Sequence, residues 1–107
     1  MTDSTYYILL ALIKPTHGYA IMQEIQESSR GEIVIGPASL YTILKKLQNA
    51  ELIEHLKVDE DRRKTYILTK KGTEIIKKDI KRRMIMVEEG KKALKLLEGS
   101  MNDCKEL

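Results

Sequence analysis

The sequence predicts a mainly α-helical protein of the α+β class that carries one small antiparallel β-hairpin. Apolar residues recur at spacings of three and four in several segments, a pattern typical of helices that bury one face. Residues 52–58 and 64–69 instead have the composition and alternation of β-strands. The five residues between them, 59–63, are all charged and must project into solvent. Helices around a single hairpin are therefore expected.

The composition limits the class of protein. A chain of 107 residues corresponds to one domain with a small appendage, and it contains no Trp or Phe. Its single cysteine, Cys104, excludes an internal disulfide framework and fits a reducing compartment. No apolar run is long enough for a membrane span, and the first residues lack a signal pattern. We therefore expect a cytoplasmic protein that makes no membrane contact.

Charge is distributed unevenly along the chain. Residues 1–36 contain two basic and four acidic side chains, and residues 84–107 contain four basic and five acidic ones. Residues 37–83 contain thirteen basic and seven acidic side chains. This central excess of positive charge favours an anionic partner, although a solvated basic surface has the same pattern.

The first elements follow from local signals. Residues 1–4 are polar, and Asp3 or Ser4 can cap a helix. Residues 6–13 predict a helix that is buried on most sides and ends at Lys14-Pro15, because Leu and Ala favour a helix over the competing buried strand. Thr16 is predicted to cap a second helix, from about 17 to 28 or 29. The β-branched triplet 33–35 predicts a short strand.

The segment from Gly36 to Ala50 predicts the helix around which the domain is organised. Pro37 suits the first helical position. A buried stripe is expected at Leu40, Ile43, Leu44 and Leu47, and a polar, basic side is expected at Ser39, Thr42, Lys45 and Lys46. Such a helix can lie on a DNA duplex, with hydroxyls near base edges and lysines near phosphates. An ordinary amphipathic surface helix is the alternative for this segment taken alone.

A last, long helix is predicted from about Lys70 to Gly99, capped by Thr69. Its apolar residues form a heptad-like seam, which needs a second surface, most simply its copy in another subunit. Folding back on its own domain is the alternative. Gly90 is expected to weaken or bend the helix. The predicted organisation is therefore a domain at 1–70, a dimerisation helix at 71–101 and a disordered tail at 102–107.

This order of elements is that of a winged helix-turn-helix, and three motifs make the likeness specific. They are Tyr6-Tyr7-Ile8-Leu9-Leu10-Ala11-Leu12 with His17-Gly18-Tyr19, then Gly36-Pro37-Ala38-Ser39-Leu40-Tyr41, then Arg62-Arg63-Lys64-Thr65-Tyr66-Ile67-Leu68-Thr69-Lys70-Lys71-Gly72. At these separations they resemble the PadR family of transcriptional regulators. The single C-terminal helix resembles the family's compact subgroup.

The resemblance implies a homodimeric repressor that binds double-stranded DNA at an inverted-repeat operator. Recognition helices would enter successive major grooves, and wings would touch flanking backbone or minor groove. It also implies release from DNA by a small phenolic or lipophilic cationic effector near the dimer interface. Stacking of a flat ligand on tryptophan is not available, since the chain has none.

Site residues are assigned from the resemblance and the helix faces together. Expected DNA contacts are Ser39, Tyr41, Thr42, Lys45, Lys46, Tyr19 and the wing residues Arg62, Arg63 and Lys64, with Arg30 as a second choice. Expected dimer contacts are Ile76, Ile80, Met84, Val87, Leu94 and Leu97. Expected effector contacts are Tyr6, Tyr7, Met84 and Met86. Packing at a core edge is the alternative for Tyr41, and packing against the first helix is the alternative for Tyr19.

Other classes of function find less support. Two isolated histidines and one distant cysteine give neither a catalytic site nor a metal ligand set, so no enzyme, cofactor or metal is expected. His17 is predicted to cap or pack, and His55 to be an exposed strand residue. A winged-helix protein-interaction module, or a regulator of another winged-helix family, remains an alternative.

Overall fold

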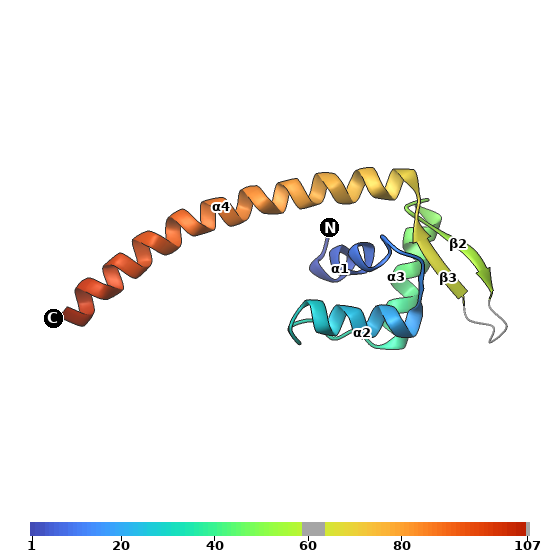
Figure 1. Ribbon diagram of the computed structural model, residues 1–107, viewed down its shortest axis with the longest axis horizontal. Coiled ribbons are helices and arrows are strands. Elements are labelled where there is room, and N and C mark those ends of the chain that lie inside the picture. The colour runs from blue at the N-terminus through green and yellow to red at the C-terminus, as the bar shows by residue number, and fades with distance from the viewer. Residues whose placement is uncertain (59–63, 107) are drawn as a thin grey trace. The chain divides into compact units, whose positions relative to one another are not determined.

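The computed structural model describes residues 1–58 and 64–106, and Figure 1 labels their helices and strands. The chain divides into two compact units, Met1–Lys77 and Lys78–Leu107. The elements are α1 (Asp3–Ala11), β1 (Thr16–His17), α2 (Gly18–Ser28), α3 (Pro37–Asn49), β2 (Ile53–Val58), β3 (Lys64–Leu68) and α4 (Lys70–Glu106). The predicted class, mainly helical with a small antiparallel sheet, is confirmed.

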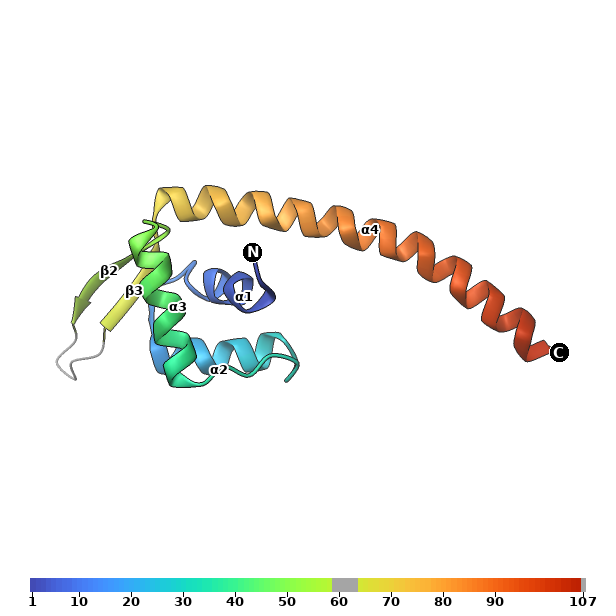
Figure 2. The same ribbon diagram turned by 180° about the vertical axis from the view of Figure 1, so that it is seen from behind.

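The core of the first unit lies where α1, α2 and α3 meet the sheet. Figure 2 shows these three helices gathered on one side of β2 and β3. The largest fully buried side chains come from all of them and from β2: Ile8, Leu9, Leu12, Ile21, Ile25, Leu40, Leu44 and Ile53. Leu and Ile thus build a core that lacks large aromatic side chains other than Tyr66, which is 4% exposed.

Helix α1 begins and ends earlier than the sequence predicted. Its N-cap is Thr2, whose hydroxyl accepts a hydrogen bond from the Thr5 N–H at 3.2 Å, rather than Asp3 or Ser4. The helix ends at Ala11, and Ile13, expected to be its last residue, is 57% exposed. The Leu12 carbonyl accepts a hydrogen bond from the Leu68 N–H at 3.1 Å. The pairing of this carbonyl with β3 accounts for the early end.

The sheet has three strands in the order β1-β3-β2, all antiparallel, and so contains one strand more than the predicted hairpin. The extra strand is Thr16–His17, which pairs with Thr65 and Tyr66. The prediction that Thr16 caps α2 was therefore wrong. The N-cap is His17, whose side chain makes no capping hydrogen bond to this helix. The second edge of β3 offers backbone partners to Thr16–His17, and this long-range pairing prevails over local capping.

The predicted strand at 33–35 is absent, and these residues are irregular. Both edges of β3 are already paired, so this triplet has no adjacent β3 edge to join. It is instead fixed by Ser29, whose buried hydroxyl bonds to the N–H and the carbonyl of Ile33 at 3.0 and 3.3 Å. High β-propensity does not form a strand without a partner strand.

A compact junction joins the end of α3 to the start of α4. Helix α3 ends in a Schellman motif, with the Leu52 N–H bonded to the Leu47 carbonyl at 3.0 Å and Glu51 at a φ of +62°. Thr69 caps α4 as predicted, accepting from the Gly72 N–H at 3.0 Å, and its hydroxyl donates to the Glu51 carbonyl at 2.6 Å. The Lys71 ammonium donates to the Ala50 carbonyl at 3.1 Å.

Glycine is required at one position of this junction. A Cβ on Gly72 would overlap the carbonyl group of Leu52, which is backbone and cannot rotate away. The two backbones therefore approach more closely than any side chain allows. This contact accounts for the glycine in the Lys70-Lys71-Gly72 sequence.

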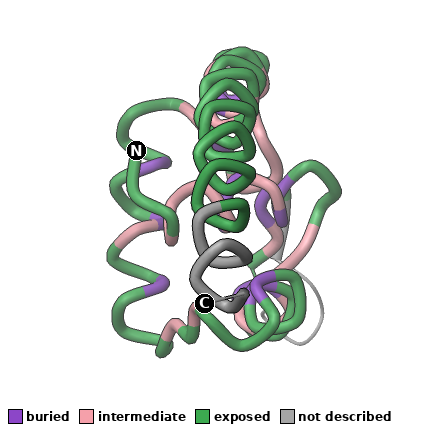
Figure 3. The backbone as a smooth tube through the Cα atoms, turned by 90° about the vertical axis from the view of Figure 1, so that its left-hand side faces the viewer, coloured by how far each residue is buried: buried purple, intermediate pink, exposed green. Residues whose placement is uncertain are grey.

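Helix α4 continues through both units without interruption. It passes Gly90 and the expected end near Gly99 and reaches Glu106. No proline follows Thr69, and a single exposed glycine costs a helix only about 1 kcal/mol. Residues 84–99 are all exposed, as the green colour of this helix in Figure 3 shows.

Candidate nucleic-acid interface

The two faces of α3 differ as the sequence predicted. Leu40, Leu44 and Leu47 are 0%, 1% and 6% exposed, and Ile43 is half-buried. Pro37 is the first helical residue. The opposite side presents five residues, all exposed, which we name the α3 outer face: Ser39, Tyr41, Thr42, Lys45 and Lys46. One helix thus combines a buried anchor with a polar and basic surface.

Tyr41 lies over the start of α2. Its hydroxyl oxygen is 2.5 Å from the position that a Cβ on Gly18 would occupy, and the side chain is 50% exposed. The absence of a side chain at Gly18 thus provides room for the Tyr41 ring. One edge of the ring thus lies against Gly18, while half of the residue faces solvent.

A second tyrosine lies close to Tyr41. Burial, and to a smaller extent the Tyr41 phenol, raise the pKa of Tyr66 above its usual value. The Tyr66 ring also makes an edge-on contact with His55, with ring centroids 5.9 Å apart. His55 was predicted to be exposed but is half-buried, and its Nε2 atom is buried without a hydrogen-bond partner in the part of the chain that the structure describes. Its place opposite Tyr66 in the β2–β3 ladder explains this burial.

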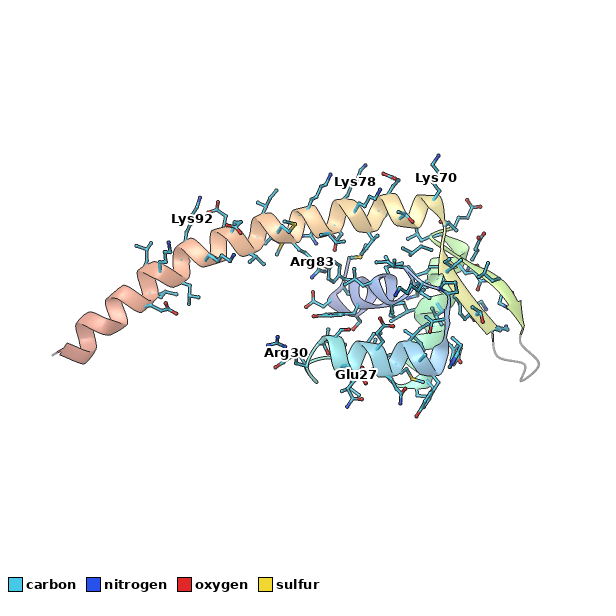
Figure 4. The ribbon with its side chains drawn as sticks, viewed as in Figure 1. Glu27, Arg30, Lys70, Lys78, Arg83 and Lys92 are labelled. Carbon is cyan, nitrogen blue, oxygen red and sulfur yellow. The ribbon has the colours of Figure 1, made fainter. Side chains whose placement is uncertain are left out.

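Tyr19 and Arg30 lie at opposite ends of α2. Tyr19 is 63% exposed, and its hydroxyl accepts a hydrogen bond from the Gln23 amide at 3.2 Å. Packing against α1 is therefore not its main role. Arg30 follows the helix at a φ of +53° and extends outward from its end, as Figure 4 shows. Both side chains are available to an anion.

The hairpin of β2 and β3 occupies the place of the predicted wing. Lys64 begins β3 opposite Val58 and is exposed. A register irregularity between His55 and Lys57 leaves Leu56 without a partner, and its side chain is 48% exposed. The predicted contacts Arg62 and Arg63 lie outside the described residues.

The predicted dimer residues are mostly uncovered. Met84, Val87, Leu94 and Leu97 are 61%, 54%, 52% and 61% exposed, and Ile80 is half-buried. These five are named the α4 seam. Ile76 differs, because it is 2% exposed and therefore already covered within the chain.

The second unit also contains a charge cluster that the sequence analysis missed. Asp79, 8% exposed, accepts hydrogen bonds from Arg83 Nε at 2.7 Å and Arg82 Nη2 at 3.0 Å. Burial alone raises the pKa of Asp79, but the hydrogen bonds and charges of both arginines outweigh it and hold that pKa below its usual value. The i,i+3 and i,i+4 spacings of these residues are the signal that could have identified it.

The predicted effector residues fall into two groups. Tyr6 and Tyr7 are half-buried in the first unit, with their rings edge to face and centroids 5.8 Å apart. Met84 and Met86 are exposed in the second unit, where Arg82 Nη1 lies 3.3 Å from the Met86 sulfur. Each group is a surface of mixed aromatic or thioether character within its own unit.

The described residues hold no group of three or more His, Cys, Asp or Glu side chains placed to bind a metal ion. Among the same residues, no helix has both the length and the apolar character of a membrane span.

The sequence of the first unit matches a known protein family. The family model described as "Transcriptional regulator PadR-like family" matches residues 8–78. The chain belongs to this family. The match runs from α1 through the hairpin into α4 and so includes α3 and its outer face. No curated protein matches the chain in sequence.

Solved structures have the same PadR-like fold. A transcriptional regulator from Clostridium thermocellum is 24% identical with a TM-score of 0.73, over 83% of this chain and 87% of that one. RosR from H. salinarum is 28% identical with a TM-score of 0.68, over 80% and 76%. Bacillus subtilis PadR in complex with operator DNA is 25% identical with a TM-score of 0.65, over 75% of this chain and 48% of that one.

Proposed function

We propose that this PadR-like regulator is a homodimeric repressor that binds an inverted-repeat operator through α3. The α3 outer face carries the proposal, because two hydroxyls, a tyrosine and two lysines are all exposed there without an acidic neighbour on that face. Hydroxyl groups suit base edges and lysines suit phosphates. The solved complex of Bacillus subtilis PadR with operator DNA supports the same use of the fold.

The proposed DNA contacts are the α3 outer face together with Tyr19, Arg30 and Lys64. Arg62 and Arg63 complete the proposed wing. We expect affinity to fall steeply with salt, since each lysine or arginine on a phosphate displaces counterions. Two recognition helices about 34 Å apart would place the half-sites about 10 base pairs apart.

The test is fluorescence anisotropy with duplexes that the full chain enriches from a random library. The variant Lys45→Glu/Lys46→Glu is expected to reduce affinity at least about a hundredfold and to flatten the salt dependence. Lys92→Glu/Lys95→Glu makes the same charge change on exposed positions of α4 and is the matched control. Equal binding by both variants, or no enriched duplex at all, would overturn the proposal in favour of a protein-interaction module.

The proposed dimer contact is the α4 seam. An exposed apolar stripe of this extent is unusual on a monomer, and a twofold axis lets the same stripe cover itself. We expect Val87→Glu/Leu94→Glu to sediment as a monomer and lose operator binding. Leu96→Glu is the matched control, because Leu96 is 75% exposed and lies on the opposite side of the helix. A dimer that survives the double change, or a wild-type monomer, would refute this contact.

The proposed release of the repressor depends on an effector, for which Met84 and Met86 are the candidate contacts in the second unit and Tyr6 and Tyr7 those in the first. Flexible thioethers and tyrosine rings suit phenolic or lipophilic cationic compounds. Phenol and tetraphenylphosphonium serve as probes of the two chemistries. We expect one of them to release the enriched duplex from the wild type at least tenfold more effectively than from Met86→Lys, which leaves the α4 seam unchanged. Equal release of the duplex from wild type and variant would exclude Met86 as an effector contact.

A further inference from the structure

The α3 outer face contains a shallow hollow beside its lysines. Four residues line it: Ala38, Ser39, Thr42 and Ile43. Ala38, Ser39 and Thr42 are exposed, and Ile43 is half-buried. Of these four side chains, none is charged and none carries an amide. Most of the lining is therefore apolar, at the centre of a surface that is otherwise polar and basic.

The state of Thr42 strengthens this apolar character. Its hydroxyl donates a hydrogen bond to the Ala38 carbonyl at 2.9 Å, one helical turn back. The donor is thus used within the helix, as is common for threonine in helices. What Thr42 offers to the hollow is chiefly its methyl group, next to the Ala38 methyl and the Ile43 side chain. From the sequence, a hydroxyl contact to a base edge is expected at this position, and the engaged donor changes that expectation.

Thymine is the base whose edge fits such a surface. In the major groove it alone presents a methyl group, whereas guanine and adenine are read by charged or amide side chains that can bond to two atoms at once. The hollow has no such side chain. The exposed lysines Lys45 and Lys46 follow it on the helix and suit the phosphates that accompany any base.

We propose that the hollow formed by Ala38, Thr42 and Ile43 receives the 5-methyl group of a thymine in each half-site. This rests on the proposed function, namely that α3 enters the major groove. Thr42 is then a specificity-determining residue through its methyl group, and Ser39 supplies a hydrogen bond next to it.

The test removes one methyl group at a time from the DNA. In a duplex that the full chain enriches, each thymine is replaced singly by deoxyuridine, which keeps every hydrogen-bonding group. We expect affinity to fall about fivefold at one thymine of each half-site, the effect of withdrawing one buried methyl group. Replacement at the remaining thymines should change affinity less than about twofold.

A matched pair of protein variants assigns the effect to the hollow. Thr42→Ser keeps the hydroxyl and removes the methyl group, so it should bind the thymine duplex about fivefold more weakly than the wild type does. Exchange of the thymine for deoxyuridine should then weaken binding by this variant little further. Ser39→Ala leaves the three apolar groups in place and should keep the full thymine preference, whatever its overall affinity.

The outcomes separate the two proposals. If the chain enriches a duplex but deoxyuridine is neutral at every position, or if Thr42→Ser keeps the wild-type preference for thymine, the thymine assignment is wrong and DNA binding stands. If no duplex is enriched, the proposed function is refuted and the assignment is refuted with it.

Discussion

Helices α3 and α4 both carry apolar residues at helical spacing, but those of α3 are buried and most of those of α4 are exposed. Both carry leucine and isoleucine at helical spacing with lysines between them. On α3 the buried leucines are at most 6% exposed, whereas on α4 Val87, Leu94 and Leu97 are more than half exposed. The first helix packs on α2 and β2 within the same chain. The stripe of the second helix has no such cover among the described residues, so an apolar stripe alone does not predict whether its own chain buries it.

The largest change in the free energy of unfolding should come from a substitution in the buried face of α3. Leu44→Ala removes a fully buried side chain and is expected to lower the free energy of unfolding by about 3 kcal/mol, because it leaves a cavity. Chemical denaturation measures this loss. Leu96→Ala, on the exposed surface of α4, should change stability by less than about 0.5 kcal/mol. Equal losses would mean that the two helices are not different in the way proposed.

The next largest effect should come from the junction between the two helices. Gly72→Ala places a methyl group against the Leu52 carbonyl and is expected to destabilise the protein by about 2 kcal/mol or more. Gly90→Ala is the same exchange later in α4, where an added Cβ meets nothing within 4 Å. It should stabilise the helix by about 0.5–1 kcal/mol. Thermal unfolding of both variants shows whether the effect on stability comes from the close contact with Leu52 or from the exchange of glycine for alanine itself.

Substitution in the cluster of Asp79, Arg82 and Arg83 measures how much ion pairs within α4 contribute to stability. Asp79→Asn should cost about 1–2 kcal/mol at neutral pH, since both arginines lose their charged acceptor. Because the pKa of Asp79 is lowered in the folded state, its contribution is complete above the pKa of an unfolded aspartate, about 3.9, and is lost as the pH falls through the lower folded value.

The pH dependence of Asp79→Asn separates this charge effect from simple packing. The difference in unfolding free energy between wild type and variant should therefore shrink below about pH 4. Glu74→Gln is the control, because Glu74 and its partner Lys77 are 60% and 62% exposed, so the pair should contribute little. A difference that is constant from pH 7 to pH 3 would contradict the assignment.

The smallest effect concerns the end of α3. Glu51 has a φ of +62°, a conformation that costs a non-glycine residue about 1–2 kcal/mol. Glu51→Gly relieves that cost but adds flexibility to the unfolded chain, so a net gain of about 0.5 kcal/mol is expected. Glu51→Ala keeps the Cβ and should give no gain. Differential scanning calorimetry distinguishes the two if neither alters the junction.

The sequence predicted what depends on local pattern and missed what depends on distant partners. The ranges of α3, β2 and β3 and the face that α3 buries follow from apolar spacing, and all were correct within a residue or two. The strand at Thr16–His17 could not be predicted locally, because its partner is almost fifty residues away. The same pairing left residues 33–35 without a free edge of β3.

In the candidate DNA-binding site, too, the sequence predicted only what depends on local pattern. The exposure of Ser39, Lys45 and Lys46 follows from helix geometry, but the hydrogen bond of Thr42 depends on a side-chain torsion that no sequence pattern specifies. The Asp79 cluster was missed although its spacing was visible, because charged residues at such spacing are usually solvated. Its burial is a property of the folded chain alone.

The contact between Gly18 and Tyr41 has an evolutionary consequence. Position 41 can change while Gly18 stays, but a side chain at position 18 would displace the Tyr41 ring from its place over α2. Among descendants of this sequence, replacement of Tyr41 by a small residue should precede or accompany the appearance of alanine at position 18. The two positions should therefore covary across relatives even though they are 23 positions apart in the chain.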